Sequence, residues 1–213
     1  MVKTNEKKCN SDLFLFIGML FTACLIVSNI TSFKVVQIGG AQLPAAVFLF
    51  VITYILNDVI AEVYGYEKAK RIIWTGFGLN LFVVLYFQFT IWLPATAGST
   101  GADAYATVLG NTPRMLAASL AAYLAGSFLN AKIMVVMKKL NEKQLFARCI
   151  TSTFFGELVD SIFFITIGFI GILPTSVVIT MIITQAAFKT LYEVIAYPLT
   201  RSVIKKIKQI EGC

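Results

Sequence analysis

The sequence has no histidine, and charged residues make up only 14% of its 213 positions. An ordinary soluble domain has about 25% charged residues. Hydrophobic residues make up 58% of the chain, and the mean hydropathy is +0.80. This composition excludes an ordinary soluble domain and is typical of an integral membrane protein.

Cysteine is scarce as well, and its spacing excludes two common uses. The four cysteines are scattered and include no C-x-x-C pair; they are Cys9, Cys24, Cys149 and Cys213. Without such a pair and without histidine, the sequence predicts neither a zinc site nor a disulfide framework. We therefore expect free thiols, no bound metal and no cofactor.

Familiar catalytic motifs are also missing. The chain has no Walker motif, no H-E-x-x-H and no G-x-S-x-G. Glu157 and Asp160 suggest a pair of acids, but an aspartyl enzyme needs carboxyl groups on facing elements, and these two lie three residues apart on one expected helix. An intramembrane enzyme is therefore the disfavoured alternative.

The net charge of +7 does not indicate a nucleic-acid partner, because the Lys and Arg residues mark the ends of apolar runs rather than form a continuous patch. All but four of the 18 basic residues fall in alternate connections or near the chain ends; the four are Lys34, Arg114, Lys132 and Lys189. The positive-inside rule then places both termini in the cytoplasm. The expected location is the inner (plasma) membrane, crossed several times.

Six apolar runs are long enough to cross a bilayer core, which takes roughly 20 residues. They fall at 13–33, 43–62, 70–93, 113–138, 148–171 and 174–198. The first run has no convincing small-residue cleavage site after it, so it is interpreted as a span rather than a signal peptide. The expected fold is an all-α integral membrane protein with six transmembrane helices.

The expected organisation is a bundle between two tails. Residues 1–12 are expected to form a cytoplasmic N-terminal tail, 13–200 the six-helix transmembrane transporter domain, and 201–213 a basic cytoplasmic C-terminal tail. The outer segment 94–112 is small, polar and glycine-rich, which favours a solvated loop, with a lid as the alternative.

Two pairs of acidic residues suggest a 3+3 inverted repeat. Asp58 and Glu62 lie in the second apolar run, while Glu157 and Asp160 lie in the oppositely oriented fifth run. Many transporters build a midplane site from such paired positions. We interpret Glu62 as an interfacial side chain that reaches toward the headgroups, and Asp58 as the deeper functional candidate.

Four ionisable side chains lie within the last two runs, namely Glu157, Asp160, Lys189 and Glu193. A charge at the centre of an isolated helix costs at least about 2.5–3.5 kcal/mol, so such residues usually face a bundle interior and mark a pathway or site. Their depths from the run ends predict a pair between Lys189 and either Asp160 or Glu157. A purely structural ion pair is the alternative.

Three carboxyl groups against one ammonium leave this expected cluster acidic. A proton, a bound cation or a substrate that donates hydrogen bonds would each compensate the excess, and each suits transport. A proton would also serve as a coupling ion without any histidine.

Five segments together resemble the queuosine precursor transporter family, also called the vitamin uptake transporter family. They are SNITSFKVV (28–36), TYILNDVIAEVYGYEKAKRIIW (53–74), PRMLAASLAAYLAGSFLN (113–130), RCITSTFFGELVDSIFF (148–164) and FKTLYEVIAYP (188–198). The resemblance spans nearly the whole chain. It implies uptake of a purine-like 7-deazaguanine base, such as queuine or its 7-cyano or 7-aminomethyl precursor, for tRNA modification.

The resemblance also implies a set of substrate-binding residues, which are Asn29, Asp58, Arg114, Ser119, Ser152, Asp160 and Lys189. The chain departs from the family at Glu157, where the resemblance implies an amide. An extra carboxylate there would favour a cationic aminomethyl base or a different proton stoichiometry. Glu157 is therefore an eighth candidate.

A guanine-like base fits the chemistry of these residues. Its Watson–Crick edge offers N–H donors for a carboxylate and a carbonyl for an ammonium. Phe154, Phe155, Tyr54 and Phe188 are candidates to stack on the base. Two transport mechanisms stay open: a self-sufficient secondary carrier, and the substrate-binding subunit of an energy-coupling-factor importer that depends on partner subunits.

Overall fold

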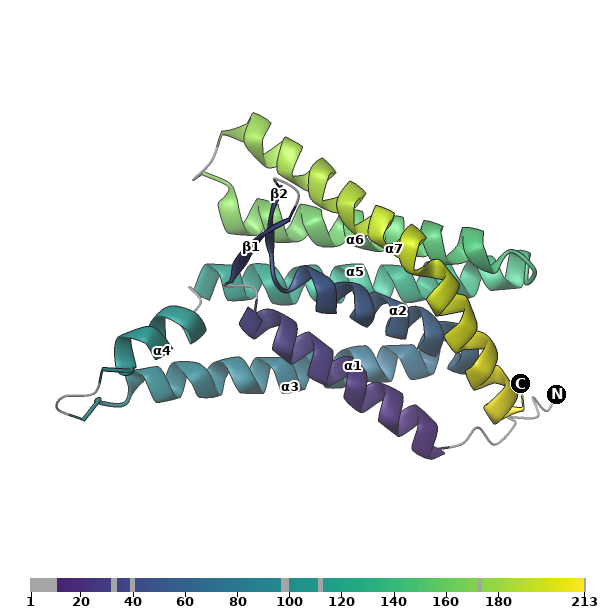
Figure 1. Ribbon diagram of the computed structural model, residues 1–213, viewed down its shortest axis with the longest axis horizontal. Coiled ribbons are helices and arrows are strands. Elements are labelled where there is room, and N and C mark those ends of the chain that lie inside the picture. Colours follow the sequence, from purple (N-terminus) through teal and green to yellow (C-terminus); the bar gives the residue numbers. More distant parts are fainter. Residues whose placement is uncertain are drawn as a thin grey trace.

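Seven helices and one small β-hairpin make up the computed structural model in Figure 1, which describes residues 11–31, 34–38, 41–96, 100–110, 113–171 and 174–212. The helices are α1 (Ser11–Thr31), α2 (Val47–Tyr64), α3 (Tyr66–Trp92), α4 (Ala102–Leu109), α5 (Pro113–Leu140), α6 (Leu145–Phe169) and α7 (Thr175–Glu211). The strands are β1 (Val35–Ile38) and β2 (Ala41–Pro44). Of the expected N-terminal tail, residues 1–10 lie outside the described residues.

Each of the six apolar runs contains one long helix, in agreement with the expected all-α class. Five of these helices are long and apolar enough to cross a membrane: α1, α3, α5, α6 and α7. The remaining one, α2, has 18 residues and is not among those five. The chain is thus a multi-pass membrane protein by helix length and composition, while six spans and an inverted repeat stay predictions.

The second expected span begins later than the sequence indicated. Residues 41–44 pair antiparallel with 35–38, with Val35 opposite Pro44 and Ile38 opposite Ala41. β-Branched residues such as Val35 and Val36 favour this extended conformation. The predicted span began at residue 43, inside the hairpin, because it was based on hydrophobicity alone. A strand of four residues is too short for its alternating pattern to be distinguished from the start of an apolar run.

The surface of the molecule is apolar where a soluble protein would be polar. Phe82, Tyr86, Phe89 and Trp92 follow one another along α3 with 51–79% of their area exposed, and their rings neighbour each other. Polar and charged side chains lie inside the bundle instead. Such a large exposed apolar surface is a membrane contact.

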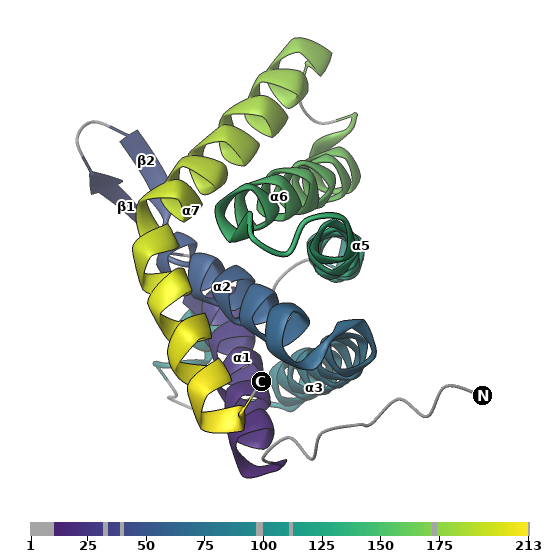
Figure 2. The ribbon, with the colours of Figure 1, turned by 90° about the vertical axis from the view of Figure 1, so that its right-hand side faces the viewer.

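Helix α2 lies at the centre of the bundle. It packs against α1, α3, α5 and α7, and Figure 2 shows it surrounded by these helices when the molecule is viewed from the end where α1 begins and α7 ends. We call this the basic end, because Lys138, Arg148 and Lys208 lie there. The opposite end, which carries the hairpin, is called the hairpin end (Figure 1).

The most extensive packing joins α5 and α6, and small residues let these helices approach closely. A methyl group added to Gly156 would lie 2.9 Å from the Asn130 Cβ and 3.1 Å from the Gly126 carbonyl oxygen. Ala122 and Ala118, one and two turns before Gly126, are buried as the small-residue spacing predicts. This crossing positions α6, which carries three of the candidate site residues, namely Ser152, Glu157 and Asp160.

Helix α7 continues through most of the segment that the sequence assigned to a C-terminal tail. It extends from Thr175 to Glu211 and has Pro198 in its interior. Proline removes a helical hydrogen bond and bends a helix, and Figure 1 shows α7 changing direction along its length. Its 37 residues span about 55 Å, more than a bilayer core of about 30 Å, so its last turns extend along the basic end.

The segment 94–112, which the sequence analysis expects on the outer side, contains a short helix rather than loop alone. Residues Ala102–Leu109 form α4, and none of its residues is buried. Thr90 and Tyr105 share a 2.8 Å hydrogen bond that connects α4 to the end of α3. The residues of α4 are exposed, as expected for this segment. The polar composition did not predict that they form a helix of two turns.

Candidate functional site

A buried ion-pair cluster joins α6 and α7 in the interior of the bundle. The Lys189 Nζ lies 2.6 Å from the Glu157 Oε2 and 2.9 Å from the Asp160 Oδ2. All three side chains are at least 90% buried. The pairing predicted from helical spacing is therefore confirmed, and both expected partners contact the same ammonium. We call Glu157, Asp160 and Lys189 the Lys189 centre.

Two aromatic residues of α2 line the Lys189 centre. The Lys189 ammonium lies 5.3 Å from the centroid of the Phe50 ring, within range of a cation–π interaction. Tyr54 is buried, and its hydroxyl lies near Gly126 at the α5–α6 crossing. That hydroxyl has no hydrogen-bond partner among the described residues. The centre thus combines an ammonium, two carboxylates, a free hydroxyl and an aromatic face.

A second polar group surrounds Asp58, two turns before the end of α2. The Ser152 hydroxyl lies 3.4 Å from the Asp58 Oδ1 and also donates to the Cys149 carbonyl at 3.0 Å. Glu193 on α7 interacts electrostatically with Asp58, and Cys149 with both carboxyl groups. Three helices therefore converge here, and Glu193 follows Lys189 by one helical turn.

Amide side chains connect further helices in the interior. Asn29 donates to the Asn80 Oδ1 at 2.9 Å, and the Ser119 hydroxyl lies 3.4 Å from the Asn29 Oδ1. Near Asp58, the Asn57 amide donates to the Asn130 Oδ1 at 2.7 Å. Buried amides of this kind join helices and offer both donors and acceptors to a ligand.

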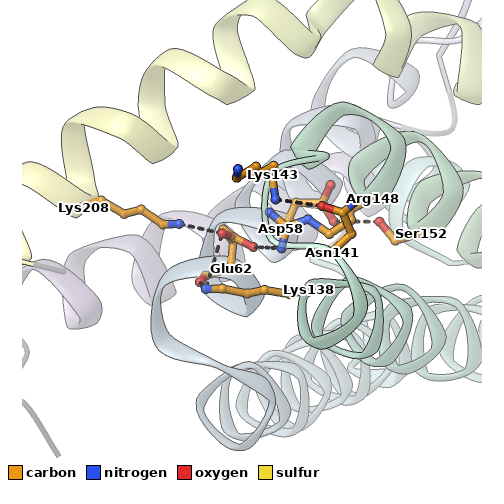
Figure 3. A network of polar contacts seen from close by, with 8 residues as sticks. All are labelled: Asp58, Glu62, Lys138, Asn141, Lys143, Arg148, Ser152 and Lys208. Carbon is orange, nitrogen blue, oxygen red and sulfur yellow. Dashed lines mark hydrogen bonds and ion pairs between the residues drawn. The ribbon is translucent and has the colours of Figure 1, made fainter.

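The basic end contains a network in which one carboxylate faces three cations (Figure 3). The Glu62 Oε2 lies 2.9 Å from the Arg148 Nη1, and the Glu62 Oε1 lies 2.6 Å from the Lys208 Nζ and 3.3 Å from the Lys138 Nζ. Lys138 also donates to the Glu62 carbonyl. Since these residues come from α2, α5, α6 and α7, the network holds four helices together at this end.

The interpretation of Glu62 as an interfacial side chain was wrong. Its side chain is fully buried, because Arg148, Lys138 and Lys208 enclose it. A side chain reaches for the headgroups when it has no partner in the protein, and the partners here come from helices distant in sequence. The nearby pair of Tyr64 with Glu211, 2.7 Å apart, also secures α7.

The sequence-derived site residues fall into three groups. Lys189, Asp160 and Glu157 meet at one point; Asp58 and Ser152 contact each other; and Asn29 contacts Ser119. Arg114 lies in the first turn of α5, and its side chain is outside the described residues. The role of all eight residues in substrate binding stays a proposal.

Sequence reasoning missed or misplaced several aromatic and amide side chains. Phe154 and Phe155 are 40% and 44% exposed on the outer surface of α6, so they do not line the interior. Phe50 and Asn80, which the sequence analysis did not select, lie in the interior network. Asn80 could have been found because it is one of two amide side chains in the apolar run 70–93, whereas nothing distinguishes Phe50 from the other 17 phenylalanines.

Comparison with known proteins finds one family and one relative. A family profile described as "Putative vitamin uptake transporter" matches residues 44–203, which is more than half of the chain. The chain is 24% identical over 201 residues to a protein of Bacillus subtilis (strain 168) named "Probable queuosine precursor transporter"; the match covers 93% of this chain and 86% of that protein. No solved structure matches the chain.

The family match includes α2, α3, α4, α5, α6 and most of α7. It therefore includes the Lys189 centre, the Asp58 group and the Glu62 network except Lys208. Its description agrees with the family that the sequence resembles, and with a bundle of apolar helices around a charged interior. The chain belongs to the vitamin uptake transporter family.

Proposed function

We propose that this chain imports a 7-deazaguanine base, such as queuine or its 7-cyano or 7-aminomethyl precursor, and binds it at the Lys189 centre. The observation that supports this most is the buried Lys189 held between Glu157 and Asp160. A buried charge cluster in a membrane bundle is expensive to maintain and usually marks a binding site or pathway.

The functional groups of the centre match the edge of the base. A guanine-like Watson–Crick edge has a ring N–H and an exocyclic amine that donate, and a carbonyl that accepts. Asp160 accepts from the two donors, and Lys189 donates to the carbonyl. Tyr54 supplies a further hydroxyl, and Phe50 supplies an aromatic face on which the planar base stacks.

In the proposed topology, α2 crosses the membrane together with the five helices named above, which gives six spans. Both termini lie in the cytoplasm, and the chain is located in the inner membrane. Residues 13–200 form the transporter domain in this proposal. The basic end then faces the cytoplasm, as the positive-inside rule requires for Lys138, Arg148 and Lys208. The Glu62 network closes that side, and the hairpin end faces outward.

A self-sufficient secondary carrier is the mechanism that we favour. The match covers 86% of a relative whose own name contains the word transporter. The absence of a Walker motif is common to both mechanisms and does not separate them. The alternative is a substrate-binding subunit that needs an energy-coupling-factor scaffold. The two differ in one observable property, namely uptake by cells that express this chain alone.

The binding site is tested with purified protein and the three bases. Asp160→Asn and Lys189→Gln remove one charge each from the centre and keep side chains of similar size. Each lost charge-assisted hydrogen bond contributes about 1.5–3 kcal/mol, so affinity should fall roughly 10- to 150-fold. Wild-type affinity in either variant would exclude that residue from the site.

Lys139→Gln serves as the control for these variants, because Lys139 is exposed at the end of α5. It also lowers the net charge by one but should bind each base as the wild type does. Size-exclusion profiles in detergent verify that all variants remain folded, since removing one partner of a buried pair also costs stability.

A further inference from the structure

Glu193 is buried inside the bundle without a partner that would compensate a negative charge. Only 1% of the residue is exposed, and neither carboxyl oxygen has a hydrogen-bond partner among the described residues. Asp58 on α2 is fully buried and interacts electrostatically with Glu193, and its Oδ2 also has no such partner. Two ionised carboxylates in this position would be strongly unfavourable.

The charged groups around this pair are engaged elsewhere. Lys189, one turn before Glu193 on α7, contacts Glu157 and Asp160. Arg148, one turn before Ser152 on α6, pairs with Glu62. No ion pair within the described part of the chain includes Asp58 or Glu193.

The remaining neighbours do not supply a positive charge either. From α6, Glu157 and the Cys149 thiol interact electrostatically with Glu193, and Glu62 on α2 interacts with Asp58. Asp58 also interacts with the Ser152 hydroxyl, the Asn130 amide, the Cys149 thiol and the Tyr54 hydroxyl, none of which carries a positive charge. The described residues also contain no cluster of three or more ligands that could hold a metal ion. A proton bound by the two carboxyl groups would supply the positive charge that these neighbours do not.

We propose that Asp58 and Glu193 form a proton-binding pair, in which one carboxylic acid O–H donates to the neighbouring carboxylate. The pair then holds one proton and one negative charge in place of two. A carboxylic acid is both a donor and an acceptor, so the shared proton satisfies oxygens that otherwise have no partner. This proposal assigns a role to Glu193. It also assigns Asp58 to proton binding, whereas the sequence analysis placed Asp58 among the residues that bind the base.

The pair is placed to couple proton binding to transport. Glu193 and Lys189 are four residues apart on one face of α7, so a change in the charge of the pair acts on the same helix that binds the base. The coupling rests on the proposed transport function, whereas the proton site itself does not. The two are therefore tested separately.

Infrared spectroscopy tests the proton site without any substrate. Purified wild-type protein in detergent at neutral pH should show the carbonyl stretch of a protonated carboxylic acid, shifted in deuterated water. Glu193→Gln should remove that signal. Asp58→Asn should shift it, because the group that accepts the hydrogen bond from the carboxylic acid changes from a carboxylate to an amide. Glu142→Gln, an exposed acid between α5 and α6, should leave it unchanged. A signal that neither Glu193→Gln nor Asp58→Asn alters would overturn the proposal.

Proteoliposomes test the coupling. Wild-type uptake of 7-aminomethyl-7-deazaguanine should accelerate when the outside is acidic and lose that acceleration with a protonophore. Glu193→Gln should abolish the response to the pH gradient. The rate at which this variant exchanges labelled for unlabelled base should stay within about twofold of the wild-type rate. A normal pH response in Glu193→Gln would reject the coupling role. If no base moves in any protein, the proposed function fails while the infrared result still decides the proton site.

Discussion

Lys189 shows how much a single residue determines in a low-dielectric interior. Its ammonium contacts two carboxylates that no other described cation pairs with. Truncating one partner of such a buried group costs about 3–5 kcal/mol, because the remaining charge is left without compensation. Charge-neutral substitutions of similar size are therefore the informative ones at this site.

Glu157 tests whether the departure from the expected amide sets substrate preference. Its carboxylate lies 2.6 Å from Lys189, so we expect it to orient the ammonium rather than to contact the variable substituent of the base. Glu157→Gln should then weaken the cationic aminomethyl base and the neutral cyano base by a similar factor, of about tenfold.

Competition binding of the two bases to wild type and Glu157→Gln measures this ratio directly. A selective loss of the cationic base, by about tenfold more than the neutral one, would show instead that Glu157 contacts the substituent.

Sequence alone predicted the Lys189 centre but not its surroundings. Glu157 and Asp160 had to share a face because they are three residues apart, and the depth of Lys189 followed from helix rise. The contacts of Glu62 and Glu193 depend on how α2, α5, α6 and α7 pack side by side. That packing is not encoded in the spacing of any one helix.

At the scale of the elements, the α5–α6 crossing depends on glycine. Gly156→Ala would place a methyl group 2.9 Å from the Asn130 Cβ and 3.1 Å from a backbone oxygen of α5. Neither atom is the flexible end of a side chain, so the helices must separate, at a cost of about 1–3 kcal/mol. Thermal unfolding in detergent should show a lower midpoint.

Gly78→Ala is the matched control, since a methyl group there has no neighbour within 4 Å. Alanine in a helix interior is favoured over glycine by roughly 0.5–1 kcal/mol. The midpoint of this variant should therefore stay the same or rise. An equal fall in both variants would mean that close approach of α5 and α6 is not the cause.

The Glu62 network should hold the basic end closed. Glu62→Gln removes the charge that attracts Arg148, Lys138 and Lys208, so α5, α6 and α7 should separate more readily from α2. Cys149, which is fully buried next to Arg148, should then react faster with a thiol reagent. The measurement uses chains in which the other three cysteines are serine.

Glu67→Gln is the control for this experiment, because Glu67 is exposed in the first turn of α3. It should leave the rate of Cys149 modification at the value of its parent chain. If Glu62→Gln also leaves that rate unchanged, the network does not govern access from the basic end.

The helices were more predictable than the segments between them. A run of about 20 apolar residues has a single favourable conformation in lipid, because a helix satisfies every backbone polar group internally. Most of the two hairpin strands and all of the short helix α4 lie outside such runs. Helix α7 continues to Glu211, where contacts such as the ion pair of Lys208 with Glu62 stabilise it. Hydropathy does not predict such contacts.

For the whole molecule, the distribution of basic residues predicts its orientation. Cysteines introduced at Asp103 and Asn141, both exposed and at opposite ends of the bundle, report the two sides of the membrane. An impermeant thiol reagent added outside intact cells should label position 103 and not 141 in a chain without native cysteines. The reverse pattern would show that the topology is inverted.

The central claim is that this chain by itself moves a 7-deazaguanine base across a membrane. The most direct measurement is uptake of queuine and its two precursors by a host without its own transporter, expressing either the wild-type chain or Lys189→Gln at equal membrane levels. We expect saturable uptake of at least one base with the wild type and uptake at the background level with Lys189→Gln. Background uptake of all three bases with the wild type, from a chain that is folded in the membrane, would contradict the account.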